Sequence, residues 1–216
     1  MKNDKLKPIA AGLCLALFLM LIALLKLVDV KAIGPNGSSV GFAALNGAFF
    51  KLTGENALLY TLSKILGYIA ILTAVFFALL GLLQLIRSKS LYKVDRDLIL
   101  LGELYIAVVL IYILFEKLII NYRPVLEDGE LAASFPSSHT MLAIVLFGSA
   151  AMQFETRLAD AKIRKAVVIC CQVLMVLTIL FRLFCGQHWL TDVIGGVLIG
   201  SALLLAYDAF DQRILK

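Results

Sequence analysis

The chain is poor in charged residues. Only 16% of its 216 residues are Asp, Glu, Lys or Arg, whereas 62% are hydrophobic. A soluble domain of this length needs far more polar side chains to cover its surface. The composition therefore excludes an ordinary soluble domain, and most apolar side chains must face lipid or other apolar helices. The length suits one membrane-embedded domain, residues 1–216.

Cysteine is also scarce and gives no metal signature. The four cysteines lie in or beside apolar stretches, without the paired spacing of a metal site (Cys14, Cys170, Cys171, Cys185). Cysteine at such positions is usually a small apolar filler. We therefore expect no metal and no other cofactor. The basic residues form no patch of the kind that binds nucleic acid, so we expect no nucleic-acid partner.

Long apolar runs, in contrast, are abundant. A helix crosses the hydrocarbon core with about 20 apolar residues, and an open sheet would leave backbone groups unpaired in lipid. The sequence therefore predicts an all-α fold, a polytopic bundle of six transmembrane helices near residues 8–28, 57–86, 98–120, 139–154, 166–184 and 192–209. No small-residue cleavage site follows the first run, so we expect a retained helix and not a secretion signal.

The basic residues indicate the orientation of this bundle. Most of them lie near the N-terminus, in the 87–97 and 155–165 loops, and in the C-terminal tail. Loops rich in Lys and Arg usually stay in the cytoplasm. The pattern therefore predicts a protein of the cell membrane with both termini cytoplasmic. The 29–56, 121–138 and 185–191 segments would then face outward.

The outward 29–56 segment has structure of its own. Gly34-Pro35-Asn36-Gly37 is a turn sequence. The apolar residues 40–50 that follow predict a short helix lying on the membrane surface. One hypothesis is that this helix, through Phe49 and Phe50, gates the entry of a lipid.

Residues that carry chemistry gather on the predicted outer side. The sequence has only two histidines, His139 and His188, and both lie beside a membrane boundary there. Arg123 follows the third predicted helix, Arg182 ends the fifth, and Asp192 begins the sixth. Two imidazoles, two guanidinium groups and a carboxylate at one end of a bundle are explained better by chemistry than by packing.

Each residue type suits a phosphate site. The 136–138 segment, Pro-Ser-Ser, favours a helix start, where free N–H groups bind phosphate, and Arg forms bidentate contacts with phosphate oxygens. Asp192 lies four residues after His188, so on a helical turn its carboxylate could hold the imidazole and leave one ring nitrogen free to attack. Taken singly, the serines could be a plain helix cap, and Arg182 could extend its charge to the membrane interface.

Together these residues resemble the type 2 phosphatidic acid phosphatase family, which shares its core with the vanadium haloperoxidases. That family carries three blocks: Lys before Arg-Pro, then Pro-Ser-Gly-His, then Ser-Arg with His and Asp downstream. The blocks appear in that order here as Lys117…Arg123-Pro124, Pro136-Ser137-Ser138-His139 and Arg182-x5-His188-x3-Asp192. The resemblance covers residues 98–209, with the catalytic blocks within 116–192.

The resemblance implies a metal-independent phosphoryl transfer. His188 would attack phosphorus and form a phosphohistidine, Asp192 would hold its ring, and His139 would protonate the leaving lipid oxygen. The phosphate-binding set would be Arg123, Arg182, Lys117 and the N–H groups near Ser137 and Ser138. The partner would be a lipid phosphate in the bilayer. Undecaprenyl diphosphate is favoured, because small outward-facing members commonly recycle that carrier.

Three positions depart from the family pattern. Glu116 stands where the family has Lys, and Lys117 follows one residue later, which on a helix is a rotation of about 100°. Lys64, near the outer part of the second predicted helix, is a possible substitute. Ser138 replaces a Gly, and Phe181 replaces a Ser and so removes one hydroxyl.

Other functions stay open at this level. The chain could pass the phosphoryl group to another lipid instead of water. It could also be a transporter with a phosphate-binding vestibule, or a lipid-binding protein without activity. Phosphatidic acid, phosphatidylglycerol phosphate and diacylglycerol diphosphate are further candidate substrates. The sequence does not indicate the oligomeric state.

Overall fold

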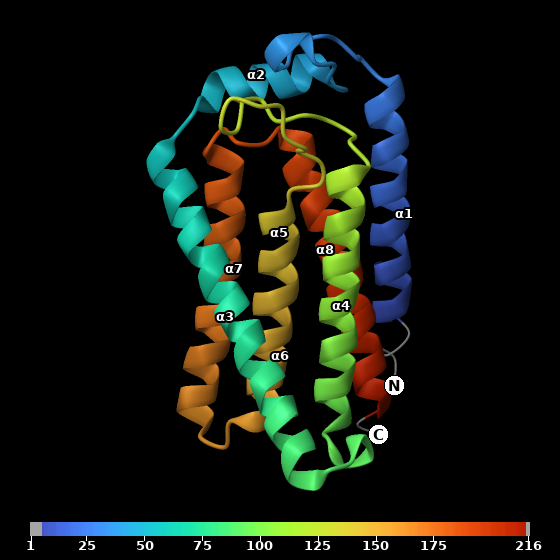
Figure 1. Ribbon diagram of the computed structural model, residues 1–216, viewed down its shortest axis with the longest axis vertical. Helices are drawn as coiled ribbons and strands as arrows, with labels where there is room; N and C mark the ends of the chain where they lie inside the picture. Colours follow the sequence, from blue (N-terminus) through green and yellow to red (C-terminus); the bar gives the residue numbers. More distant parts are fainter. Residues whose placement is uncertain (1–5, 215–216) are drawn as a thin grey trace.

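The computed structural model describes the backbone of residues 6–214 and the side chains of residues 6–211. The predicted all-α class is confirmed, and the long helices run side by side as a bundle (Figure 1). A π-helical segment, Ala143–Phe147, joins α5 to α6, and short 3-10 turns lie at Pro35–Gly37 and Leu91–Lys93. The α-helices are α1 (Leu6–Leu27), α2 (Ala43–Thr53), α3 (Ala57–Ser88), α4 (Arg96–Lys117), α5 (Ser138–Leu142), α6 (Gly148–Arg157), α7 (Ala161–Phe184) and α8 (Leu190–Ile214).

Within residues 6–214, five helices are long and apolar enough to cross a membrane: α1, α3, α4, α7 and α8. They correspond to five of the six predicted segments. The sixth predicted segment, 139–154, is the continuous rod formed by α5, the π-helical segment and α6. Because the π-helical segment divides this rod, it does not count as one long α-helix. Its crossing of the membrane therefore stays a prediction.

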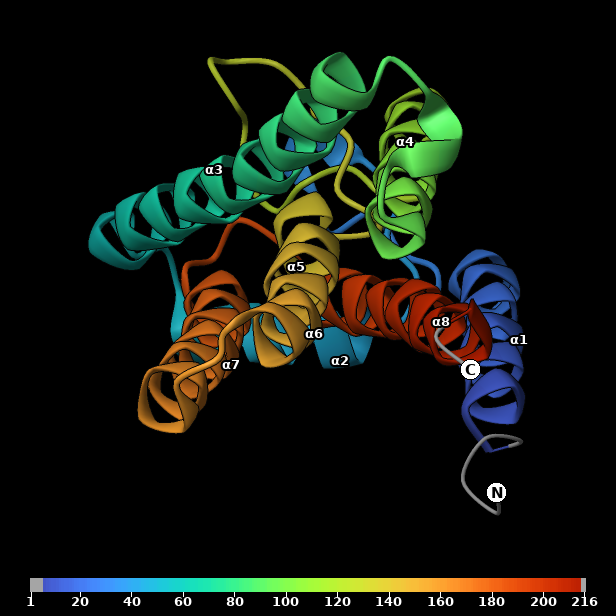
Figure 2. The ribbon, with the colours of Figure 1, turned by 90° about the horizontal axis from the view of Figure 1, so that it is seen from below.

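The rod occupies the centre of the bundle (Figure 2), and all five residues of its π-helical segment are buried. It packs closely on α8 because glycines there present no side chain, as is common where membrane helices touch. A Cβ atom on Gly196 would lie 2.7 Å from the Ser137 carbonyl oxygen and 2.8 Å from Cβ of Thr140. One on Gly200 would lie 3.1 Å from Cβ of Ile144.

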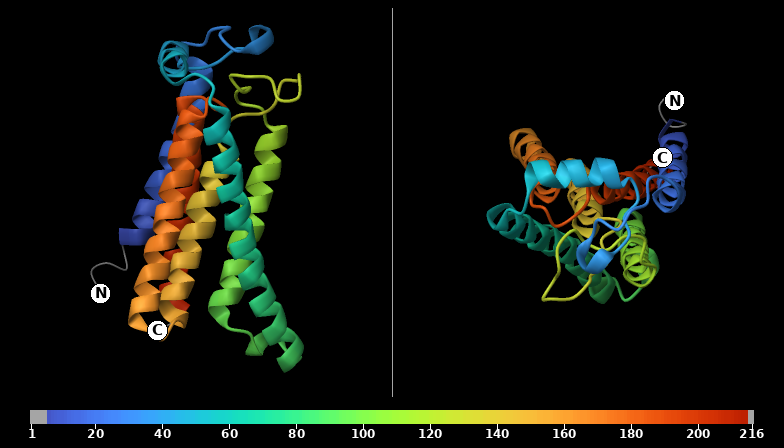
Figure 3. Two further views of the ribbon diagram at one scale, coloured as in Figure 1. Left: turned by 90° about the vertical axis from the view of Figure 1, so that its left-hand side faces the viewer. Right: turned by 90° about the horizontal axis from the view of Figure 1, so that it is seen from above.

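The predicted sidedness of the loops agrees with their placement. α1 begins and α8 ends at the end of the bundle opposite to α2 (Figures 1 and 3). At that same end, Arg157 of α6 pairs with Asp95 at 3.0 Å and with Asp97 at 2.6 Å, which ties α6 to the start of α4. The loops between α3 and α4 and between α6 and α7 therefore share one end. Its assignment to the cytoplasm rests on the basic residues alone.

The short helix predicted within 40–50 is α2, which lies across the other end of the bundle (Figures 1 and 3). The Asp29 carboxylate fixes its start by accepting a hydrogen bond of 2.6 Å from the Ala44 N–H group. Gly41, just before the helix, lies so close to the Leu25 carbonyl that a larger residue would clash with it. α2 is thereby held against the outer end of α1.

The close contact between α5 and α8 leads to a stability prediction. Gly196→Ala should lower the melting temperature of the purified protein by roughly 2–10 °C, because the added methyl group overpacks a buried contact. Gly102→Ala in α4 is the matched control, since nothing lies within 4 Å of its added Cβ atom. Equal melting temperatures for the two variants would contradict this account of the packing.

Candidate active site

The bundle brings five of the predicted site residues to the end that carries α2. His139 lies in the first turn of α5, Arg182 in the last turn of α7, and Asp192 in the first turn of α8. His188 lies in the loop between α7 and α8, and Arg123 lies in the loop between α4 and α5. Because α5, α7 and α8 are neighbours, residues far apart in sequence meet there.

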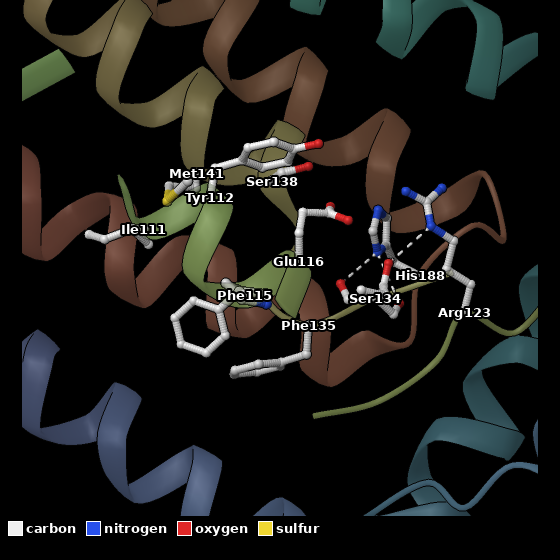
Figure 4. Close-up of a pocket in the computed structure, with 12 residues that line it drawn as sticks. Ile111, Tyr112, Phe115, Glu116, Arg123, Ser134, Phe135, Ser138, Met141 and His188 are labelled. Carbon is white, nitrogen blue, oxygen red and sulfur yellow. Dashed lines mark hydrogen bonds between the residues drawn. The ribbon is translucent and has the colours of Figure 1, made fainter. Parts of the chain in front are cut away.

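A relay of hydrogen bonds holds His188, which is only 4% exposed. Its Nδ1 atom lies 3.1 Å from the Ser134 carbonyl oxygen and 3.2 Å from the Ser134 hydroxyl (Figure 4). The Ser134 hydroxyl donates to the Asp192 carboxylate at 2.5 Å. This carboxylate also accepts from the Trp189 N–H group at 2.9 Å and from the Asn121 amide at 3.4 Å. The expected direct contact between Asp192 and His188 is therefore wrong, because Ser134 stands between them.

This relay fixes the tautomer of His188. A backbone carbonyl can only accept, so Nδ1 carries the proton and Nε2 keeps its lone pair. Within residues 6–211, Nε2 is buried and has no hydrogen-bond partner. Burial, followed by the positive charges of Arg123 and Arg182, lowers the pKa of His188 well below its ordinary value. The imidazole is therefore neutral at pH 7, which is the form that can act as a nucleophile.

Arg182 is the most unusual residue of the site. Its side chain is 1% exposed, and none of its three guanidinium nitrogens has a hydrogen-bond partner in the described part of the chain. Its Cζ atom lies over the ring of Tyr60, 5.3 Å from the centroid. A buried, unpaired charge is costly, so this position strongly favours a bound anion. Nδ1 of His139 is also buried and has no hydrogen-bond partner within residues 6–211.

Two cavities meet beside Arg123. The smaller is lined by His188, Ser134 and Glu116 (Figure 4). The larger, of about 690 Å³, lies between α3 and α4 and is lined by His139 and Arg182. Arg123, Ser138 and Tyr112 line both cavities. The two histidines therefore line neighbouring cavities, and Arg123 belongs to the wall of both.

The two serines of the second block have different roles. Ser137 is fully buried, and its N–H group donates to the Asp192 carbonyl oxygen at 2.9 Å. Its expected role in binding phosphate through this N–H group is therefore wrong, because the group already joins α5 to α8. Ser138 is the first residue of α5, as the helix-start sequence predicted, and it faces both cavities.

The structure does not bring Lys117 to the site. Lys117 is exposed at the end of α4 and lines neither cavity, whereas the preceding Glu116 lines the smaller one. The cause is the one-residue shift, which turns the side chain by about 100° around the helix. Lys64 of α3, in contrast, lines the larger cavity together with His139 and Arg182.

The α2 segment clamps the loop that carries His188. Asn46 is fully buried: it donates to the Thr191 hydroxyl at 3.0 Å and accepts from the Thr191 N–H group at 3.2 Å. At the other end of α2, the Asn56 N–H group donates to the Cys185 carbonyl oxygen at 3.1 Å. Gly186, at a positive φ of 72°, passes so close to Gly54 that no side chain fits there. Residues 185–191 are thus held at both ends by contacts with α2 and with the residues that follow it.

The hypothesis of a gate at Phe49 and Phe50 finds no support in this arrangement. Phe49 packs on Phe184 with 6.2 Å between ring centroids, and Phe50 packs on Trp189 at 5.8 Å. α2 lies over α7 and α8 (Figure 3), and neither ring lines the cavity between α3 and α4. These aromatic residues anchor the clamp.

Sequence reasoning missed the residues that hold the predicted site residues in place. Ser134 lies two residues before Pro136, and Asn121 lies two before Arg123, so proximity to a block was their only signal. Asn46 had none, because its partner Thr191 is 145 residues away. Such partners depend on how the loops close over the bundle.

The fold and the site together define a polytopic helical membrane protein with a histidine- and arginine-lined site at one end. The sequence model of the PAP2 superfamily matches residues 70–214. The chain belongs to the PAP2 superfamily, and the family resemblance stated from its motifs is confirmed.

A curated protein and a solved structure, both from Bacillus subtilis, are similar to the chain. Phosphatidylglycerophosphatase B of strain 168 is 31% identical over 97 residues, which is 44% of this chain and 47% of the relative. The match therefore spans about half the length of that protein. The crystal structure described as the first transmembrane PAP2 type phosphatidylglycerolphosphate phosphatase superposes with a TM-score of 0.66. It is 24% identical, covers 96% of each chain, and shows the shared fold.

The relay through Ser134 can be tested by a double-mutant cycle. Ser134→Ala and Asp192→Asn should each destabilise the protein by about 1–3 kcal/mol, because each disturbs a buried charged hydrogen bond. The double variant should cost less than the sum of the two, since the residues share that bond. Ser149→Ala, another buried serine, is the control and should combine additively with Asp192→Asn. Additive effects for Ser134 and Asp192 would refute the relay.

Proposed function

We propose that this chain is a lipid phosphate phosphatase of the cell membrane that works through a phosphohistidine on His188. The observation that carries the proposal is Arg182, a permanent charge that is 1% exposed and has no hydrogen-bond partner among the described residues. A phosphate group supplies several acceptor oxygens and the matching charge. Membership of the PAP2 superfamily supports the same conclusion.

The first step transfers the phosphoryl group to the protein. Nε2 of His188 attacks phosphorus, a nitrogen–phosphorus bond forms, and the bond from phosphorus to the lipid oxygen breaks. His139, as the imidazolium that the bound phosphate anion stabilises, gives its proton to that leaving oxygen. In the second step, His139 takes a proton from water, the resulting hydroxide attacks phosphorus, and the nitrogen–phosphorus bond breaks. Phosphate leaves, and both histidines return to their initial states.

The surrounding residues stabilise the charge that moves in these steps. Arg123 lines both cavities and Arg182 lines the larger one, where they would bind the equatorial oxygens. Ser138, which faces both cavities, is placed to donate to the same group. Asp192 acts through Ser134. It accepts the Ser134 hydroxyl hydrogen bond and so keeps the carbonyl and hydroxyl of that residue beside Nδ1 of His188. Little reorganisation is then needed when the reaction begins.

The larger cavity supports a lipid substrate over a small soluble ester. Its end near His139 and Arg182 is cationic, whereas the part between α3 and α4 is lined by apolar residues such as Ile71, Val75 and Val108. A lipid could place its phosphate at the cationic end and its chains along the apolar part. Phosphatidylglycerol phosphate is the first lipid to test, because the similar protein of B. subtilis is named for it. Undecaprenyl diphosphate remains the substrate that the sequence favours.

We further propose that the site faces outward. The basic loops lie at the opposite end of the bundle, and loops of this kind usually stay in the cytoplasm. The central rod would be the sixth crossing, since its 20 residues span about 30 Å as a helix. Both termini would then be cytoplasmic, and the lipid headgroup would meet water on the outer side.

Purified protein should release phosphate from phosphatidylglycerol phosphate, undecaprenyl diphosphate or phosphatidic acid in the presence of EDTA. His188→Ala should lower the rate by at least about 1,000-fold, because it removes the nucleophile. Lys117→Met, outside both cavities, is the control.

Adding an acceptor lipid to the assay distinguishes a phosphatase from a phosphotransferase. A phosphotransferase would give a phosphorylated lipid instead of free phosphate. Release that survives His188→Ala would sink the mechanism, and no reaction with any of the three lipids would favour a binding protein.

The lowered pKa of His188 predicts the acid side of the pH profile. The neutral imidazole exists above its pKa, so lowering that pKa extends the reactive form to lower pH. We expect kcat/KM, which reports the free enzyme, not to fall as the pH is lowered from 7.5 to about 6.5, after correction for the substrate phosphate that titrates near pH 6. A fall with its midpoint at or above pH 6.5 would contradict a buried, neutral His188.

A further inference from the structure

Lys64 belongs to the face of α3 that borders the site. Tyr60, Lys64, Gly67 and Ile71 are spaced four, three and four residues apart, which places them on one face of a helix. A Cβ atom on Gly67 would lie 3.0 Å from Cδ2 of His139 and 3.5 Å from its Nε2. α3 therefore touches His139 at Gly67, and Lys64 lies one turn nearer the outer end of the helix.

Lys64 and Arg182 both contact the ring of Tyr60. The Nζ atom of Lys64 lies 4.8 Å from the centroid of that ring, and Cζ of Arg182 lies 5.3 Å from the same centroid. No carboxylate lies within 4 Å of either cation among residues 6–211. Two such cations at one cavity repel each other, and an anion bound in that cavity would reduce the repulsion.

Carboxylates offset part of the charge on the other side of the site. Glu127 lies 3.4 Å from the Arg123 guanidinium group, and Glu116 lines the smaller cavity beside it. A phosphate dianion bound next to these acids needs a further cation. Lys117 does not supply it, because that side chain is exposed and outside both cavities.

We infer that Lys64 binds the substrate phosphate. From α3, it supplies the positive charge that the family pattern places at position 116 of α4, where this chain has Glu116. This inference rests on the proposed function. A lysine two turns inside a membrane helix can also extend to the interface without any ligand. The side chain of Lys64 instead lines the cavity with His139, Arg123 and Arg182.

The test compares Lys64→Met, Lys64→Arg and Lys117→Met with the unchanged protein. Lys64→Met should lower kcat/KM by about 10- to 100-fold, mainly through KM, because it removes one charged hydrogen bond to phosphate. Lys64→Arg keeps the charge and should stay within about 5-fold, and Lys117→Met within about 2-fold. Glu116→Lys in the Lys64→Met background should restore part of the loss.

Binding of inorganic phosphate gives a readout that needs no catalysis. Phosphate should raise the melting temperature of the unchanged protein and of Lys117→Met, and it should raise that of Lys64→Met less. If the unchanged protein binds phosphate through Lys64 but hydrolyses no lipid, the proposed function fails and the inference stands. If Lys64→Met matches the unchanged protein in both turnover and phosphate stabilisation, or only Lys117→Met loses them, the inference is overturned.

Discussion

The packing of α5 on α8 is the contact on which the site depends. Glycines of α8 let the two helices approach until the Ser137 N–H group bonds the Asp192 carbonyl oxygen. That single backbone bond joins the second sequence block to the third and sets the distance between the two histidines. The other supports are built around it: Ser134 connects Asp192 to His188, and Asn46 fixes Thr191 from outside. Side chains at the glycine positions would push α5 away from α8 and would separate the two sequence blocks.

Electrostatics explains why the site is buried in this way. The cost of burying the Arg182 charge, which has no hydrogen-bond partner among residues 6–211, is met by the interior contacts of the apolar bundle around it. In such surroundings a charge interacts with a bound anion more strongly than it does in water. The same burial gives a neutral imidazole and a strong anion site, so a single physical cause serves both the proposed nucleophile and the anion that it would attack.

Much of this arrangement could be predicted from the sequence. Apolar length identified five long helices, because spanning lipid requires such runs whatever the fold, and the motif order placed His139, His188, Arg123 and Arg182 together. The relay through Ser134 could not be predicted, since it depends on how the loop between α4 and α5 folds back. The choice between Lys64 and Lys117 depends on which faces of α3 and α4 turn inward. Apolar periodicity says little about this when nearly every position in a helix is hydrophobic.

The cations of the site come from separate elements around one cavity. Lys64 belongs to α3, Arg182 to α7, and Arg123 to the loop that follows α4. α3 packs directly on α7, and Lys64 and Arg182 both contact the ring of Tyr60. Under the proposed function a lipid would enter between α3 and α4, and a movement of α4 that widens this passage would leave the cations of α3 and α7 in place. Opening for the lipid chains and retention of the phosphate would then be mechanically independent.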